Sequence, residues 1–558
     1  MNRNQRAIDI TVELLKKHGV RHIVISPGAT NLAFVNAVKN DPAFTCYSIV
    51  DERSAIYFAI GLYLQTGEII AASCTSAQAT RNYIPGLTEA FYKRVPILAI
   101  TMEKHVRFIG QEYMQAPHQM SLPDDSVKQS FETPFVSDVN DEYHCIRVVN
   151  EAILKTKEKS YGPVQLCIPW LDFPIKDERP EIRKIEQLYE CDCKDINLGS
   201  KKVLVVIGEH LPFTEEEKKS IESFAEKHNC AIYANHLSNY DGKYVINANL
   251  GLTTLSIENF IKDYAPDVII TIGGQTGDYP LYLLISKPEL KAEHWRISED
   301  GQIVDTYDKL TKVFCMSEKS FFNAVDNTNS DHSFYEKFNS LCLKMDTNIE
   351  VPLSNAYLAQ ELHTILPKNS IMQFSILNSL RVWNLFDLDP SIQCYSNVGA
   401  FGIDGGLSTL IGQSIATDKM SYMIIGDLAF YYDMNSLGIR HIKNNLRVIV
   451  INNNGGVEFK LSDGDHAEVD KYTAAANHYK NAKGWAETCG FKYIDVRSKE
   501  DLQKNKKLLV EESEQPIVME IFVSDADDYK GYKNIVDANK KVSMTDKMKK
   551  GFGKLVRF

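Results

Sequence analysis

The sequence predicts an α/β protein made of three doubly wound parallel-sheet domains. Strand-like apolar segments alternate almost continuously with helix-length segments, which is typical of this architecture. The chain has 558 residues, which is too long for one hydrophobic core and suggests three domains of about 180 residues each. One strand-helix-strand unit carries polar residues after both of its strands, as expected where a parallel sheet opens onto a ligand.

The composition is that of an ordinary soluble globular protein, with 44% hydrophobic and 24% charged residues. The formal net charge of −11 disfavours a general nucleic-acid binder. No run of eighteen apolar residues exists, and the amino terminus reads as an amphipathic helix rather than a signal peptide. We therefore expect a cytoplasmic protein that binds neither nucleic acid nor membrane.

The eleven cysteines contain no C-x-x-C pair. Several lie in apolar strands, as Cys167 does, and are expected to be reduced and buried. Cys191 and Cys193 could attract a metal, but no histidine lies nearby and a linker is the better interpretation.

The first block of the chain is expected to form a domain over residues 1–180. Its predicted strands lie at 22–26, 45–50, 69–73, 96–101 and 164–168. A polar, charge-rich connector follows over about 176–200, and a second domain is predicted over 200–347. The third domain is predicted over 355–558, with strands at 371–374, 422–425, 448–451 and 517–523.

The third block contains the most informative motif of the chain. Its strand at 423–425 runs into Gly426 and Asp427, and its strand at 448–451 runs into three asparagines and two glycines. Such strand ends meet at one edge of a parallel sheet. Asp427, the Asn453 side chain and a backbone carbonyl near Gly455 would together suit a Mg²⁺ ion bound to a diphosphate. The alternative interpretation is a β-turn plus an Asn-Gly hairpin turn.

This motif resembles the signature of thiamine diphosphate enzymes, in which an Asp and an Asn hold Mg²⁺ against the cofactor's diphosphate. The resemblance covers essentially the whole chain and assigns the three blocks to the pyrimidine-binding, central and diphosphate-binding domains of that family. It implies metal ligation by Asp427, Asn453 and Gly455. It also implies cofactor contacts from the surrounding residues Gly426, Asp427, Leu428, Asn453, Gly455, Gly456 and Val457.

The first block carries the second match, at Glu52. This residue follows a strand and begins a helix with Ala55, Phe58, Ala59 and Leu62 on one face. The resemblance implies that its carboxyl binds the cofactor's pyrimidine nitrogen N1′, so that the 4′-amino group can take the C2 proton. Glu52 should then be desolvated, with a raised pKa. Alternatively, Asp51 and Glu52 merely favour a helix N-terminus.

Three further segments resemble the family. In 401–412, Ile403 is expected beneath the cofactor, where it would bend the two rings toward each other, although an isolated isoleucine is usually core. In 74–90, Ala77 and Gln78 replace a more usual Gly-Thr pair, and Gln78 is a candidate catalytic amide. Asn378 and Ser379 are expected near the diphosphate, with a helix cap as the alternative.

Within the family, these motifs are most similar to those of succinyl-enolpyruvyl-hydroxycyclohexene-carboxylate synthases, carboligases of the menaquinone pathway. Those enzymes decarboxylate 2-oxoglutarate and add the product to isochorismate, and their pockets need cationic side chains for several carboxylates. Here the corresponding basic positions are occupied by Ala29 and Thr30, Asp278 and Tyr279, Trp383, and Val398. We infer that the catalytic apparatus is kept while the specificity pocket is rebuilt.

The candidate substrate residues follow from this alignment and are Ala29, Thr30, Arg107, Arg381, Trp383, Glu458 and Phe459. Arg81, Arg107 and Arg381 could bind carboxylates, although surface or interface positions are commoner for arginine. Glu458 would disfavour anionic acceptors and could hydrogen-bond a hydroxylated one.

The resemblance predicts decarboxylation of a 2-oxo acid followed by carboligation of the enamine to a second carbonyl or an activated acceptor. Simple decarboxylation and an inactive cofactor-binding homologue are the alternatives. No G-x-G-x-x-G follows a strand, so a nicotinamide cofactor is not expected, and no glycine-rich loop favours FAD. The family implies a homodimer or homotetramer, with the cofactor between two subunits. The lysine-rich segment 529–558 is expected to form a solvated helix.

Overall fold

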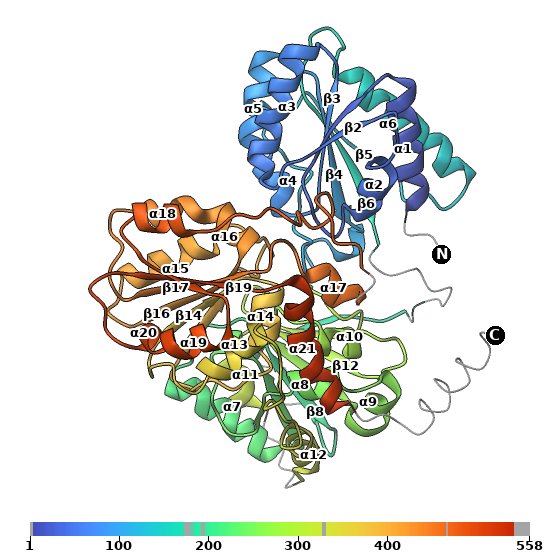
Figure 1. Ribbon diagram of the computed structural model, residues 1–558. Coiled ribbons are helices and arrows are strands. Elements are labelled where there is room, and N and C mark those ends of the chain that lie inside the picture. Colours follow the sequence, from blue (N-terminus) through green and yellow to red (C-terminus); the bar gives the residue numbers. More distant parts are fainter. Residues whose placement is uncertain are drawn as a thin grey trace, which may run out of the picture.

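The structure is a computed structural model that describes residues 4–171, 180, 182–190, 193, 196–325, 331–464 and 467–540. It contains three separate sheets whose paired strands are all parallel. Figure 1 shows the first domain standing above the other two, which pack side by side below it. The prediction of three doubly wound α/β domains is confirmed.

The first sheet has the strand order β2-β1-β3-β4-β6-β5. Its strands are β1 (His22–Ile25), β2 (Thr45–Ser48), β3 (Ile70–Cys74), β4 (Ile97–Lys104), β5 (Ser130–Glu132) and β6 (Val164–Trp170). The accompanying helices are α1 (Gln5–Lys17), α2 (Leu32–Val38), α3 (Glu52–Thr66), α4 (Gln78–Asn82), α5 (Ile84–Lys93), the 3-10 helix η1 (Val106–Phe108) and α6 (Val139–Lys155).

The central sheet has the order β10-β9-β8-β11-β12-β13-β7. Its strands are β7 (Glu186–Leu188), β8 (Val203–Ile207), β9 (Cys230–Ala234), β10 (Val245–Ile246), β11 (Val268–Ile272), β12 (Glu293–Ile297) and β13 (Leu310–Phe314). Its helices are α7 (Glu215–Lys227), η3 (His236–Ser238), α8 (Asn249–Thr253), α9 (Ile257–Tyr264), α10 (Pro280–Ile285), α11 (Glu318–Ala324) and α12 (Ser333–Cys342).

The third sheet has the order β15-β14-β16-β17-β19-β18, which repeats the topology of the first. Its strands are β14 (Ile371–Phe374), β15 (Gln393–Ser396), β16 (Ser421–Gly426), β17 (Leu446–Asn452), β18 (Lys492–Val496) and β19 (Ile517–Phe522). Its helices are α13 (Asn355–Leu362), α14 (Asn378–Trp383), α15 (Gly406–Ile415), α16 (Asp427–Asp433), η4 (Met434–Gly438), α17 (Glu458–Asp463), α18 (Lys483–Thr488), α19 (Lys499–Asn505), α20 (Lys507–Val510) and α21 (Asp525–Asn539).

Each sheet is covered on both faces, so its strands are buried almost throughout. The alternating residues of β8 show this: Val203, Val205 and Ile207 belong to one apolar cluster, whereas Leu204 and Val206 belong to another. The first and third sheets are likewise packed between two apolar clusters each. Two buried faces explain why these strands read as continuous apolar runs rather than as alternating patterns.

The structure differs from the sequence prediction at the connector and the chain ends. Strand β7 lies within the predicted connector and pairs with β13 at the edge of the central sheet. Cys193 is buried, which supports a structural role for this thiol, whereas Cys191 lies outside the described residues. The sequence predicts a solvated carboxyl-terminal helix, but the described part of it belongs to α21, which buries Tyr529, Ile535 and Val536. Residues 541–558 lie outside the described range.

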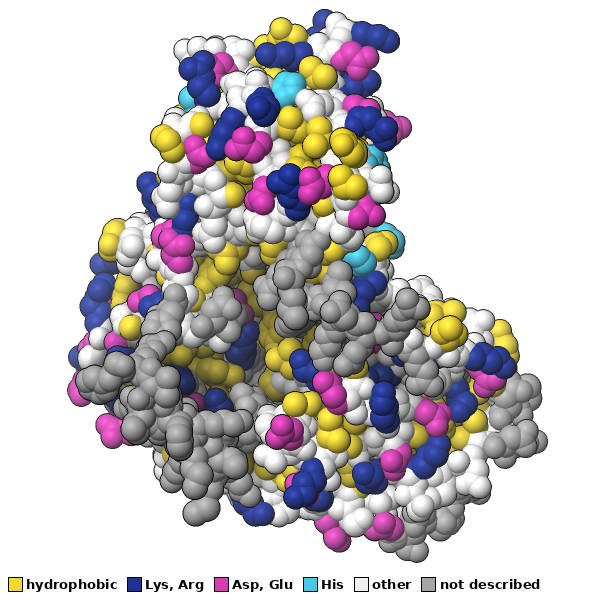
Figure 2. All heavy atoms as spheres, turned by 90° about the vertical axis from the view of Figure 1, so that its right-hand side faces the viewer, with side chains coloured by type: hydrophobic (Ala, Val, Ile, Leu, Met, Phe, Trp, Pro, Cys, Tyr) yellow, Lys and Arg dark blue, Asp and Glu magenta, His cyan; other side chains and the backbone are white. Residues whose placement is uncertain are grey.

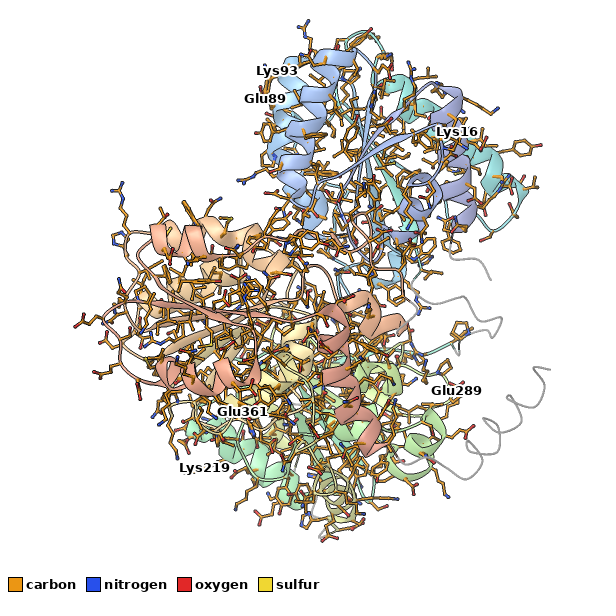
Figure 3. The ribbon with its side chains drawn as sticks, in the orientation of Figure 1. Lys16, Glu89, Lys93, Lys219, Glu289 and Glu361 are labelled. Carbon is orange, nitrogen blue, oxygen red and sulfur yellow. The ribbon has the colours of Figure 1, made fainter. Side chains whose placement is uncertain are left out.

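Charged side chains cover the outer helix faces. Figure 3 shows Glu89 and Lys93 on the outer face of α5, where they form an ion pair of 3.6 Å. In the part of the chain that the structure describes, no helix combines the length and apolarity needed to cross a membrane.

The segment 468–474 of the third domain contacts the first domain. The Lys39 ammonium lies 2.5 Å from Glu468 and 2.8 Å from Asp470, and only 5% of the Lys39 side chain is exposed. The Tyr472 hydroxyl donates to the backbone carbonyl of Cys46 at 3.1 Å. This docking brings the carboxyl ends of the first and third sheets toward each other.

Candidate active site

A cavity of about 1340 Å³ opens where the three domains meet. Figure 2 shows a hollow with hydrophobic side chains between the first domain, at the top, and the rest of the molecule. The turns that follow β1, β2 and β3 line it from above, and those that follow β14, β15, β16 and β17 line it from below. The cavity therefore lies at the carboxyl ends of two parallel sheets, the usual place for a ligand in such folds.

Asp427 begins α16 at the bottom of the cavity and is only 2% exposed. The backbone N–H of Leu428 donates to its Oδ1 at 2.7 Å, and that of Gly455 donates to its Oδ2 at 3.0 Å. His478 Nε2 also lies 3.0 Å from Oδ2. These bonds tie the Gly-Asp turn after β16 to the asparagine turn after β17, as the sequence motif requires.

Asn453 supplies the neutral oxygen predicted beside Asp427. Its Oδ1 is buried and has no hydrogen-bond partner among the described residues. Its Nδ2 donates to Asp528 at 3.0 Å, which turns the amide so that the oxygen is left for another ligand. No cluster of three or more His, Cys, Asp or Glu side chains suited to a metal is found in the described ranges. A cation here would rely on one carboxylate, neutral oxygens and its own ligand, a set that suits Mg²⁺.

Asp528 on α21 contacts the candidate site residues Asn378 and Asn453 and was not selected in the sequence analysis. Its carboxylate accepts hydrogen bonds from Asn453 Nδ2 at 3.0 Å, Asn378 Nδ2 at 2.9 Å and the Asn355 backbone N–H at 2.8 Å. Burial raises the pKa of this carboxyl. In the sequence, Asp528 lies in an acidic first turn, where aspartate is expected for ordinary helix stability. No local pattern distinguishes it from its exposed neighbours.

Glu52 lies on the opposite side of the cavity and is 6% exposed. The pKa of its carboxyl is raised to about 8, mainly by burial, with a smaller contribution from the nearby charges of Asp404 and Asp51. The helix cap is formed instead by Asp51, whose Oδ1 accepts from the Ser54 N–H at 3.2 Å. The two interpretations of this acidic pair therefore separate: Asp51 caps α3, and Glu52 is the buried acid of the cavity.

Tyr432 of the third domain connects Glu52 to the rest of the site. Its hydroxyl accepts from the Glu52 backbone N–H at 3.2 Å and from Asn82 Nδ2 at 3.1 Å. Neither Tyr432 nor Asn82 was selected from the sequence, because nothing in their local pattern distinguishes them from other helix residues.

Gln78 and Asn378 both line the cavity and are positioned by the same unusual turn. The residue before each has a positive φ, with φ 67° and ψ −121° at Ala77 and φ 65° and ψ −122° at Leu377. This conformation is strained for any residue with a Cβ and typically costs about 1–3 kcal/mol. It explains why glycine is the more usual residue at the position of Ala77.

Ile403 and the remaining predicted cofactor residues also border the cavity. Ile403 is partly buried against the apolar clusters on both faces of the third sheet. The other cavity-lining residues of this set are Ser379, Gly426, Leu428, Gly455, Gly456 and Val457.

Arg381 and Glu458 form a part-buried ion pair in the wall of the cavity. Arg381 Nη1 donates to Glu458 Oε2 at 2.8 Å, and Nη2 donates to Oε1 at 2.7 Å. Burial by itself lowers the pKa of Arg381, but the Glu458 carboxylate outweighs it and raises this pKa. The Arg381 guanidinium also lies over the Tyr279 ring, 5.1 Å from its centroid. Ala29 and Phe459 line the cavity too, as predicted.

Three predicted substrate residues are not among those that line the cavity. Arg107 pairs with Asp308 at 3.1 Å, and about half of each side chain is exposed. Thr30 is buried away from the cavity. Trp383 is fully buried in the core, where its Nε1 donates to Asn355 at 3.1 Å. Helix periodicity explains the position of Trp383, because α14 directs Arg381 toward the cavity and Trp383 toward the core.

Three other positions considered in the sequence analysis, Arg81, Val398 and Asp278, are also not among the residues that line the cavity. Arg81 donates to the backbone carbonyl of His118, and Val398 is fully buried. Asp278 lies inside the central domain, where it accepts hydrogen bonds from Tyr233 and Asn235. Conversely, Lys104 lines the cavity although the sequence analysis did not select it.

Both halves of the cavity match one enzyme family. Residues 5–122 match the N-terminal TPP binding domain of thiamine pyrophosphate enzymes, and residues 378–521 match the C-terminal TPP binding domain. A 2-succinyl-5-enolpyruvyl-6-hydroxy-3-cyclohexene-1-carboxylate synthase of Phocaeicola vulgatus is 34% identical over 554 residues, covering 94% of this chain and 98% of the relative. The chain belongs to the thiamine pyrophosphate enzyme family.

Two more members of this thiamine pyrophosphate family support the assignment, and both carry the same synthase name. The protein of Bacteroides thetaiotaomicron is 32% identical, covering 92% of this chain and 94% of the relative. That of Flavobacterium johnsoniae is 29% identical, covering 92% and 95% respectively. The predictions of the family, of an enzyme and of thiamine diphosphate (thiamine pyrophosphate) as the cofactor class are confirmed. Both matched domains contribute residues to the cavity described above.

Proposed function

We propose that this protein uses thiamine diphosphate and Mg²⁺ to decarboxylate a 2-oxo acid and to join the remaining acyl fragment to a second carbonyl compound. One observation carries the proposal: the buried acid Glu52 and the pair Asp427 and Asn453 border the same cavity. The curated relatives are named as synthases, which favours ligation over release of an aldehyde.

The overall reaction is balanced without an external oxidant or reductant. The bond between the keto carbon and the carboxylate of the donor breaks, and CO₂ leaves. The electron pair of that bond forms a new bond to the carbonyl carbon of the acceptor, whose oxygen takes up one proton. The product is a 2-hydroxyketone. When bound, the cofactor supplies the electron sink that makes the loss of CO₂ possible.

The protein's own groups bind and orient the reactants. At neutral pH a carboxyl with a pKa of about 8 is largely protonated, so Glu52 can donate a hydrogen bond to a ring nitrogen of the cofactor. Asp427, the Asn453 side chain and the Gly455 backbone would hold Mg²⁺. Asn378, Ser379 and the glycines after β16 and β17 would surround the diphosphate, with Ile403 beneath the rings.

We also propose self-association as a homodimer or homotetramer, in line with the family. The present structure contains one chain, in which both domains already line the cavity. Sedimentation analysis with and without cofactor tests this point, and an active monomer would exclude it.

The central experiment measures CO₂ release from pyruvate, 2-oxoglutarate, oxaloacetate and phosphonopyruvate, with thiamine diphosphate and Mg²⁺. We expect release from one acid by the wild type and its loss in Glu52→Gln. The matched control is Glu89→Gln, because Glu89 lies on the outer face of α5 (Figure 3). Equal release by wild type and Glu52→Gln would contradict the proposal. Release of a free aldehyde as the sole product, with every carbonyl acceptor tested, would indicate simple decarboxylation instead.

A further inference from the structure

The Arg381 and Glu458 pair lies where a second substrate would approach. Arg381 is on α14, which follows β14. Glu458 begins α17, which follows the asparagine turn after β17. Their side chains are 13% and 17% exposed and both border the cavity. The pair is therefore part of the cavity wall, close in sequence to the predicted diphosphate contacts Asn378 and Val457.

The pair engages both Nη nitrogens of Arg381 and neutralises its charge. Two parallel hydrogen bonds of 2.8 and 2.7 Å join the guanidinium to both oxygens of Glu458, the strongest arrangement that such a pair can adopt. Because Glu458 already neutralises the charge of Arg381, a substrate carboxylate would gain little net attraction from the guanidinium and would be repelled by the Glu458 carboxylate. Displacing Glu458 would leave a part-buried carboxylate without its cation, which is unfavourable. Arg381 is thus a poor partner for an anionic acceptor.

The charges around the cavity also disfavour an anionic acceptor. Of the described residues that line it, the basic ones are Lys104 and Arg381, and the acidic ones that are charged at neutral pH are Asp9, Asp404, Asp427 and Glu458. The other basic side chain of the lining, Lys104, is buried, and its Nζ lies 5.8 Å from the centroid of the Tyr113 ring. A lining with more acidic than basic side chains disfavours a second substrate that carries carboxylates of its own.

Aromatic and hydroxyl groups surround the pair. Tyr279 stacks against Arg381 with 5.1 Å between the guanidinium carbon and the ring centroid. Phe459 and Tyr532 also border the cavity, and Tyr532 lies close enough to Arg381 and Glu458 for their charges to act on its hydroxyl. Flat rings beside a paired acid and base suit the CH and OH groups of a polyhydroxylated carbon chain.

We propose that the acceptor is an uncharged, hydroxylated aldehyde or ketone, and that the Arg381 and Glu458 pair selects it against carboxylated carbonyl compounds. This inference rests on the proposed function and names the class of its second substrate. The hydroxyl groups of such an acceptor can accept hydrogen bonds from the guanidinium and donate to the carboxylate without breaking the pair. The acceptor's carbonyl carbon forms the new bond, and its oxygen is protonated, as written above.

The test compares two acceptors of nearly equal size, glycolaldehyde and glyoxylate, in which a hydroxymethyl group is replaced by a carboxylate. The donor is whichever 2-oxo acid releases CO₂, and ligation products are quantified by mass spectrometry. We expect kcat/KM for glycolaldehyde to exceed that for glyoxylate by at least about tenfold in the wild type, the effect of roughly one charge-assisted hydrogen bond.

Glu458→Gln separates this inference from a general preference for aldehydes. The substitution removes the negative charge and frees Arg381, so the ratio of the two kcat/KM values should fall by about tenfold or more. The matched control is Glu361→Gln, which breaks the Glu361 and Lys506 pair of 2.7 Å in the same domain. Figure 3 shows Glu361 in the lower part of the third domain. The control should keep the wild-type ratio.

Binding gives a second readout that does not depend on turnover. Saturation-transfer NMR on the cofactor-loaded enzyme without donor should detect glycolaldehyde in the wild type and glyoxylate more strongly in Glu458→Gln. A wild type that prefers glyoxylate, or a ratio unchanged in Glu458→Gln, would overturn the inference. CO₂ release without ligation of either aldehyde would also overturn it while leaving decarboxylation in place. Absence of CO₂ release from every donor would instead remove the proposed function, and this inference with it.

Discussion

Two parts of the cavity differ in how they handle charge. The part lined by the predicted cofactor residues Glu52, Asp427 and Asn453, here called the cofactor end, contains the buried Asn453 Oδ1, which has no hydrogen-bond partner among the described residues. In another part of the wall, Arg381 and Glu458 satisfy each other through two short hydrogen bonds. The first part leaves an oxygen for a ligand, whereas the second is already neutralised. The difference teaches that cofactor binding and substrate choice can change independently within one cavity.

The largest effect is expected from a substitution that changes the cofactor end alone. Glu52→Gln removes the ionisable carboxyl while keeping its size, and we expect CO₂ release to fall by about 10²- to 10⁴-fold, the usual effect of losing a proton-transferring group. Cofactor affinity, measured by calorimetry, should change much less. A variant that keeps more than a tenth of the wild-type rate would show that Glu52 has no such role.

A second substitution weakens the cofactor end without touching a predicted ligand. Asp528→Asn loses the carboxylate that orients Asn378 and Asn453. Partners that orient metal ligands typically contribute about 10- to 100-fold in affinity. We expect a loss of this size in the Mg²⁺ dependence of thiamine diphosphate binding, followed by tryptophan fluorescence. Asp537→Asn, on the exposed side of the same helix, should bind as the wild type does. Equal affinities in both variants would argue against the orienting role.

The buried acid at the cofactor end also predicts a pH effect on stability. The pKa of Glu52 is about 8 in the folded protein, compared with 4.5 for an ordinary glutamate. The folded state therefore keeps a proton that the unfolded chain has already released. This contribution is fully present below pH 4.5 and is lost as the pH rises through 8.

Urea unfolding of the cofactor-free protein between pH 5 and 8 measures this effect. The free energy of unfolding of the wild type should fall relative to that of Glu52→Gln across the range. Burial also raises the pKa of Glu103, to about 7, but this group is present in both proteins and cancels in the difference. A difference independent of pH would mean that Glu52 is not buried as described.

The smallest expected effect concerns the strained turn before Gln78. Ala77→Gly should relieve a strain of about 1–3 kcal/mol, offset by about 0.5–1 kcal/mol of extra freedom in the unfolded chain. The net stabilisation is about 1 kcal/mol, or about 2–4 °C in the midpoint of thermal unfolding. Ala79→Gly within α4 should instead lower the midpoint, because its backbone is helical. The same sign for both variants would contradict the strained conformation.

Sequence reasoning succeeded where the chemistry is local in the chain. Asp427 and Asn453 follow neighbouring strands of the third sheet, Glu52 follows a strand of the first, and the docking of the two domains brings all three to one cavity. It failed where partners are distant: Asn453 and Asp528 are 75 residues apart, and Arg381 and Glu458 are 77 apart. It also misplaced Arg107 and Trp383, because a match of sequence position does not say which side of a helix or loop faces the site. The edge strand β7 has no apolar run to mark it.

The segment that contacts the first domain also contacts the asparagine turn after β17. The N–H of Gly456 donates to the Ala474 carbonyl at 2.7 Å, and a Cβ on Gly455 would lie 2.8 Å from Ala476. Two residues before Tyr472, Asp470 holds Lys39 of the first domain. One short length of chain thus connects the turn at Gly455 and Gly456 to the contact with the first domain. By reciprocal linkage, any ligand that stiffens the Gly455 turn should tighten the closure of the two domains, and forced separation of the domains should expel the cofactor.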